Sequence, residues 1–241
     1  MSIYELKILF DLNPKSKSKT LDKYAKKFRL GYFFVDSENG HCYLFDRYGK
    51  EKDISLVHEI NEDMILLDIK KIAIPNNVTN IRDEAFRSCT KLTSVTISDS
   101  VTSIELAAFA NCTKLTSMTI PNSVTRIGKS VFFGCSGLKN VTIGNGVMCI
   151  GNSAFDSCSG LTSVTIPNNV IIIGGCAFYS CSSLISATIG NNVTSIGWGA
   201  FKYCSNLKSI IFKNKTIEQV KAMLSYPFGI KDESIIKAEL S

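Results

Sequence analysis

The cysteines are the residues of this chain whose type and regular spacing could support chemistry. Six of the nine cysteines follow one another at intervals of 23 residues: Cys89, Cys112, Cys135, Cys158, Cys181 and Cys204. Thiols stacked at a fixed interval could form disulfides or bind a metal ion, because stacked strands bring Cα atoms near the separation that a disulfide needs. We interpret them instead as packing residues, since a small, weakly polar side chain fits a tight corner of a core.

The remaining residues give little support for catalysis. The chain has two histidines, His41 and His58, and Cys42 beside His41 falls short of the roughly four ligands of a metal site. We find no Ser-His-Asp, Cys-His or paired-carboxylate arrangement. We therefore expect a protein that is not an enzyme and that needs no metal or cofactor.

Composition indicates a folded chain. Of the 241 residues, 45% are apolar and 20% are charged, which is too hydrophobic for a disordered protein. The net charge of +6 is milder than that of most dedicated nucleic-acid binders. Nucleic acid is thus not the partner that we expect.

We expect no Sec-type leader at the start of this sequence. Glu5 and Lys7 interrupt the apolar start that a secretory leader needs, and the longest apolar runs fall far short of a bilayer span. We expect reduced thiols and a location in the cytoplasm or a host-cell interior, or at the surface or outside the cell if a leader was removed.

The cysteine interval belongs to a repeat that covers much of the chain. Phenylalanine recurs at the same step from Phe86 to Phe201, and leucine does so from Leu92 to Leu207. Valine recurs from Val78 to Val193 and isoleucine from Ile81 to Ile196. Six copies without an insertion predict a repeat architecture, and a partial copy begins near residue 66.

Each unit predicts one coil of a solenoid. Residues 92–97 end in alternating apolar and polar residues, which is typical of a half-buried strand. A turn follows at 98–100, then a short β-like segment at 101–104 and an Ala-Phe-x-x-Cys stretch that is long enough for one helical or 3₁₀ turn. Stacked coils about 4.8 Å apart would place the recurring apolar side chains in one continuous core.

This repeat resembles the BspA-type leucine-rich repeat over residues 66–212. The resemblance implies an α/β solenoid, a right-handed array with a parallel sheet, and a role in binding other molecules without catalysis. Family members named as adhesins bind host matrix proteins or neighbouring cells. The alternatives that we keep are a cell-surface or host-matrix adhesin and a structural or assembly component of a phage or mobile element.

The flanks predict two further units. Residues 1–65 lack the repeat and indicate a small α+β N-terminal domain or cap, with a helix near residues 20–28 and a hairpin that pairs residues 31–35 with 41–45. Residues 213–241 predict a C-terminal helical cap, because apolar residues between Ile217 and Leu224 share one helical face and the last coil needs a cover.

Two surfaces are candidates for binding a protein partner. The outward positions of the predicted strands form two rows of hydroxyl and amide groups: Ser94, Thr96, Ser117, Thr119, Asn140, Thr142, Ser163, Thr165, Ser186 and Thr188. Lys139 lies beside them, at a position where most other copies carry threonine. Such rows could dock a partner or could reflect only the preference of threonine for exposed strand positions.

The second surface consists of aromatic residues at variable positions. Phe133, Tyr179, Trp198 and Tyr203 stand where other copies carry small or charged residues, so we expect them to face outward. Exposed aromatics often mark an interface, and the alternative is that they pack against the C-terminal cap.

A run of positive charge lies near the N-terminus. Its members are Lys15, Lys17, Lys19, Lys23, Lys26, Lys27 and Arg29. We interpret it as a solvated face rather than a nucleic-acid contact, because acidic residues downstream nearly balance it. The sequence thus predicts a recognition protein whose partner is another protein and whose oligomeric state is open.

Overall fold

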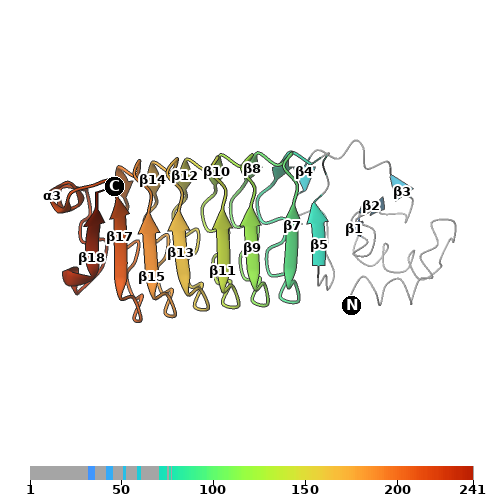
Figure 1. Ribbon diagram of the computed structural model, residues 1–241. Coiled ribbons are helices and arrows are strands. Elements are labelled where there is room, and N and C mark those ends of the chain that lie inside the picture. Colours follow the sequence, from blue (N-terminus) through green and yellow to red (C-terminus); the bar gives the residue numbers. More distant parts are fainter. Residues whose placement is uncertain are drawn as a thin grey trace.

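The computed structural model describes residues 32–35, 42–45, 51–52, 59–60, 71–74, 76 and 78–240 (Figure 1). From residue 71 onward the chain winds into stacked coils, each of which contributes one long strand and one two-residue strand. The predicted repeat solenoid with parallel sheets is therefore confirmed.

The long strands lie side by side along one face of the solenoid (Figure 1). They pair in parallel as three ladders, β5–β7, β9–β11 and β13–β15–β17–β18. Their bounds are β5 Lys71–Ile74, β7 Ser94–Ile97, β9 Ser117–Ile120, β11 Asn140–Ile143, β13 Ser163–Ile166, β15 Ser186–Ile189, β17 Ser209–Lys213 and β18 Ile236–Glu239.

The short strands form a second sheet, with seven strands in parallel and no break. They are β4 Glu59–Ile60, β6 Asn80–Ile81, β8 Ser103–Ile104, β10 Arg126–Ile127, β12 Cys149–Ile150, β14 Ile172–Ile173 and β16 Ser195–Ile196. Because β4 pairs with β6, this sheet already begins upstream of residue 66.

Turns make up the remaining side of each coil, and they too are bonded from coil to coil. In each case an amide donates to a carbonyl 22 residues later, as from Phe132 N to Ala154 O (2.8 Å). Two residues per coil have a left-handed backbone, for example Ser153 (φ 53°) and Ser157 (φ 60°). Left-handed residues four positions apart rule out even one regular α-helical turn, so the Ala-Phe-x-x-Cys stretch forms consecutive turns.

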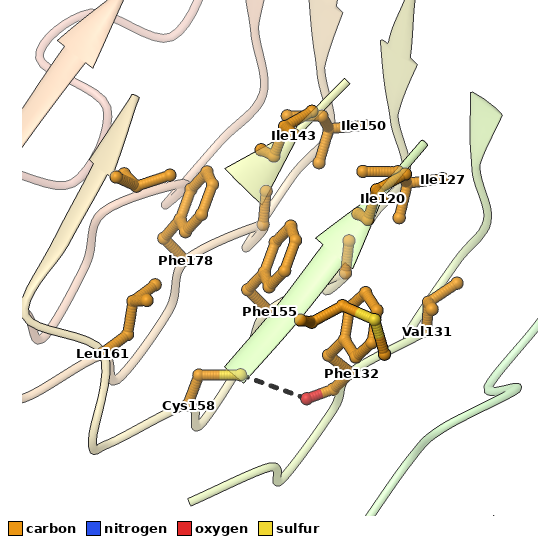
Figure 2. Packing of buried hydrophobic residues seen from close by; sticks show 14 of the residues in the cluster. Ile120, Ile127, Val131, Phe132, Ile143, Ile150, Phe155, Cys158, Leu161 and Phe178 are labelled. Atoms are coloured by element: carbon orange, nitrogen blue, oxygen red, sulfur yellow. Dashed lines mark hydrogen bonds between the residues drawn. The ribbon is translucent and has the colours of Figure 1, made fainter. Parts of the chain in front are cut away.

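The core is a stack of phenylalanine rings. All six repeat phenylalanines from Phe86 to Phe201 are at most 2% exposed. Phe155 stacks on Phe132 and on Phe178 with ring centroids 5.2 Å apart in both cases (Figure 2). The repeat valines and isoleucines are also buried, which matches the single dry core that the repeat predicts.

The expected α/β class and helical C-terminal cap are not confirmed. Within residues 78–240 the structure has one α-helix, α3 Ile217–Lys221, and one 3₁₀-helix, η2 Glu233–Ile235. A capping box at Thr216 and Gln219 begins α3. The segment continues into β18, which pairs with β17 because the last coil offers an open strand edge.

The predicted N-terminal hairpin is confirmed, because β1 Tyr32–Val35 pairs antiparallel with β2 Cys42–Phe45. Strand β3 Glu51–Lys52 extends this sheet. The predicted helix near residues 20–28 and the basic run at 15–29 lie outside the described residues. None of the helices in the described part of the chain has the length and apolar character needed to cross a bilayer.

Candidate functional site

The rows of hydroxyl groups lie on the outer surface of the long strands. Thr96, Thr119, Thr142 and Thr165 are exposed, and Thr188 at the C-terminal end of the row is half-buried. In the neighbouring row Ser117, Asn140 and Ser163 are exposed, whereas Ser94 and Ser186 are half-buried. The structure thus brings the predicted strand residues together on one face.

Strand register holds each row in line. Thr119 pairs with Thr142 across β9 and β11, and Thr165 pairs with Thr188 across β13 and β15. The alternate residues of each strand point inward, as with buried Val164 and Ile166 in β13. Because the apolar side chains of each strand are buried in the core, the hydroxyl groups between them must face outward.

Residues other than threonine end the row on both sides, and two residues beside the row differ from the usual threonine. Ala73 in β5 pairs with Thr96, and Ile211 in β17 pairs with Thr188, so the row covers five coils. Lys139 is exposed beside it, and so is Ile185 (48%) in the next variable position. Any selectivity of this face would come from such departures from threonine.

The predicted aromatic residues lie on the turn side, and three of them, Tyr179, Trp198 and Tyr203, belong to one cluster. Trp198 is 64% exposed and Tyr203 is 55% exposed, whereas Tyr179 is half-buried. Tyr179 packs edge-on against Tyr203, with centroids 5.0 Å apart and planes at 89°. Phe133 is 39% exposed and has no ring contact with this cluster among the described residues.

A lysine that the sequence analysis did not single out connects the cluster. The ammonium nitrogen of Lys202 lies 4.8 Å from the centroid of the Trp198 ring and 5.0 Å from that of Tyr203. Lys202 occupies the same repeat position as Phe133 and Tyr179. Its spacing of four residues from Trp198 could have indicated a contact, but only the turn geometry brings the side chains together.

A second group missed by sequence reasoning lies on the sheet of short strands. Met148, Ile171 and Ile172 are 50%, 40% and 45% exposed at positions that carry threonine, serine, asparagine, arginine or cysteine in the other coils. This departure from the polar columns is the signal that could have identified them.

The cysteine ladder is a packing device in this structure. Cys112, Cys135, Cys158 and Cys181 are fully buried, and Cys89 and Cys204 at the ends are half-buried. From Cys112 onward each thiol donates a hydrogen bond to the phenylalanine carbonyl 26 residues earlier, with distances from 3.0 to 3.2 Å. The eight cysteines within residues 78–240 are all free thiols.

Burial makes several of the thiols weak nucleophiles, and the acids within the described ranges form no metal site. Burial raises the pKa of Cys158 and, together with a smaller effect of Cys112, raises that of Cys89 to about 12. Burial also raises the pKa of the half-buried Cys176 thiol. Within the described ranges, no group of three or more His, Cys, Asp or Glu residues could hold a metal ion.

Comparisons with known proteins agree with this fold. The family model described as a BspA type leucine rich repeat region matches residues 66–159 and 127–231, with six copies. A solved leucine rich repeat protein from T. pallidum is 21% identical with a TM-score of 0.61, over 85% of this chain and 89% of that one. The pneumococcal vaccine antigen PcpA is 18% identical with a TM-score of 0.43, over 64% of this chain and 56% of that one.

A third solved structure is a leucine rich cell surface protein from Faecalibacterium prausnitzii. It is 19% identical with a TM-score of 0.34, over 87% of this chain and 92% of that one. No curated protein matches the sequence.

Proposed function

This chain belongs to the BspA-type leucine-rich repeat family, and on that premise we propose that it is a non-enzymatic recognition protein that binds a protein partner on the outer surface of its repeat array. The fold supports this because coils that share one core hold their exposed side chains in fixed positions. A surface that is already ordered loses little conformational entropy on binding.

The observation that carries the proposal is the aligned threonine row on the long strands. Thr119 and Thr142 are paired in register and exposed, and Thr165 continues the row in β13. Polar groups that are held on a rigid sheet can make several hydrogen bonds to a partner at once. We propose the strand positions Ser94 to Thr188, with Lys139 at their margin, as the main contact surface.

The test is affinity capture from the native environment with the full chain and two matched variants. Thr142→Arg together with Thr165→Arg places bulky charges on the proposed surface. Thr125→Arg places the same side chain at an exposed position preceding β10, away from the threonine row. Arginine at all these positions projects into solvent, so the fold should persist.

We expect wild type and Thr125→Arg to recover the same protein, and the double variant to recover at least tenfold less of it. Equal recovery by all three chains would show that this face is not the binding surface. Recovery of no specific protein by the wild-type chain would contradict the recognition role itself.

A further inference from the structure

The aromatic cluster of the last coils holds a positive charge at the surface. Lys202 places its ammonium group over the rings of both Trp198 and Tyr203, at 4.8 and 5.0 Å from their centroids. Both rings are more than half exposed. A cation between two aromatic faces is attracted to both of them, so its position is defined before any partner binds.

The base of the Lys202 side chain lies close to two glycines, Gly199 and Gly229. A side chain at Gly229 would come within 2.7 Å of the Lys202 Cβ, so the terminal segment packs directly against this part of the side chain. A Cβ at Gly199 would lie 3.7 Å from the Lys202 Cβ, which is ordinary contact distance. The contacts of the ammonium group with the two rings favour one position of the side chain, so less rotamer freedom is left to lose on binding.

This charge has no acidic partner among residues 78–240. Among residues 78–240 no carboxylate lies within ion-pair distance of the Lys202 ammonium group. The nearest acid in its repeat column, Asp156, belongs to a coil two steps earlier and accepts a hydrogen bond from Ser157 at 2.8 Å. An ammonium group that is positioned but unpaired is complementary to a carboxylate.

Tyr203 stands in a backbone conformation that does not favour it. Its φ is 64°, in the left-handed region, and the same repeat position holds serine, asparagine or glycine in the other coils. A bulky residue with this φ is uncommon and strained, and such strain tends to occur at functional sites. Tyr203 is 55% exposed, so burial of a large core side chain does not explain the strain.

Resting on the recognition role proposed above, we propose that Trp198, Lys202 and Tyr203 form a docking site for an acidic polypeptide segment. One carboxylate of the segment pairs with the Lys202 ammonium group, and an apolar neighbour packs on the Trp198 ring. Tryptophan and tyrosine are common among the residues that dominate binding energy at protein interfaces.

A polypeptide fits these observations better than a polyanion. Nucleic acids and sulfated polysaccharides bind through several cations in a row. In the Trp198 repeat column the described cation is Lys129, three coils earlier and roughly 14 Å away. The Lys202 column includes the acid Asp156 two coils earlier, and its other cation, Arg87, lies five coils earlier and pairs with Glu84. One cation with aromatic neighbours suits one carboxylate with an apolar neighbour.

The test uses Trp198 as its own reporter, because it is the one tryptophan of the chain. A random dodecapeptide phage library is selected on the full-length protein, and enriched sequences are synthesised and titrated against it by tryptophan fluorescence. We expect enriched peptides to carry Asp or Glu within two residues of an apolar side chain and to change the Trp198 emission.

Matched variants separate this site from general attraction of acids. We expect Lys202→Gln to weaken peptide binding at least tenfold, and Lys208→Gln, at an exposed lysine preceding β17, to change it less than twofold. Tyr203→Asn removes the ring but suits the left-handed backbone, as Asn111 does in the same repeat position, so it should weaken binding without lowering the melting temperature.

Several results would overturn the proposal. They are enriched peptides without acidic residues, an unchanged Kd in Lys202→Gln, no peptide that alters Trp198 emission, or tighter binding of heparin or single-stranded DNA than of any peptide. If the natural partner is lost in the Thr142→Arg and Thr165→Arg chain but kept in Lys202→Gln, this site fails and the recognition role stands.

Discussion

The thiol of Cys158 donates a hydrogen bond to the carbonyl of Phe132 in the preceding coil, at 3.1 Å (Figure 2). The same carbonyl accepts from the amide of Cys135 at 3.1 Å. Each such carbonyl is therefore bonded both within its coil and to the next one. The cysteines of this column form no disulfides. Cysteine can recur here because its thiol is a small hydrogen-bond donor that fits inside an apolar stack.

Reactivity with a thiol reagent should follow position in the ladder. We expect Cys112, Cys135, Cys158 and Cys181 to remain unlabelled by DTNB in the native protein, because they are fully buried. The half-buried Cys89, Cys149, Cys176 and Cys204 should react before these four. Peptide mass spectrometry after timed labelling checks this, and native labelling of Cys158 as fast as Cys176 would contradict it.

Alkaline pH should weaken the stack. Burial raises the pKa of Cys158 above its ordinary value of 9.0, so the folded state keeps a proton that the unfolded state releases. The stabilisation is complete below about pH 9 and declines as the pH rises from there toward the folded pKa, by up to about 1.4 kcal/mol per pH unit for one thiol.

Urea unfolding at several pH values between 9 and 10.5 measures this effect. We expect the free energy of unfolding to fall less steeply with pH in Cys158→Ala than in the wild-type chain. The same slope in both chains would mean that this thiol ionises equally in the folded and unfolded states.

Loss of one ring from the stack should be costly. Phe155→Ala removes a fully buried side chain that stacks on two neighbours, so it should lower the free energy of unfolding by about 3–5 kcal/mol. Phe133→Ala, at a ring that is 39% exposed, should cost less than about 1 kcal/mol. Denaturant unfolding compares the two, and equal losses would contradict the assigned core.

Two adjacent glycines should respond differently to alanine. A Cβ at Gly174 would lie 2.5 Å from the Asn152 amide nitrogen in the preceding coil, whereas at Gly175 its nearest heavy atom would be 3.5 Å away. Gly174→Ala should therefore destabilise by roughly 1–3 kcal/mol through overpacking, and Gly175→Ala should be near neutral. Thermal melting distinguishes them, and a neutral Gly174→Ala would mean that the coils can separate there.

Most of the coil could be predicted from residue columns. The identical spacing of Phe155 and Cys158 with their copies predicts the core and the corner, because inward positions tolerate few residue types. The absence of helix in the Ala-Phe-x-x-Cys stretch could not be predicted in this way. Serine at positions such as Ser153 gives little indication that the backbone there is left-handed.

The terminal segment and part of the candidate site also escaped prediction. Residues 236–239 become a strand because β17 leaves an open edge, and no local pattern in the sequence indicates that partner. The outward aromatics could be predicted from their variable columns. Lys202 could not, because its role depends on the turn that brings its ammonium group over Trp198.

Every inner coil donates its turn-side amide hydrogen bonds to carbonyls 22 residues later, so one inner coil can replace another. Excising one whole 23-residue unit, such as residues 124–146, would hand each amide of the coil before it an equivalent carbonyl in the coil after it. Gene duplication or deletion can therefore lengthen or shorten the rod in whole steps while both ends keep their own closures.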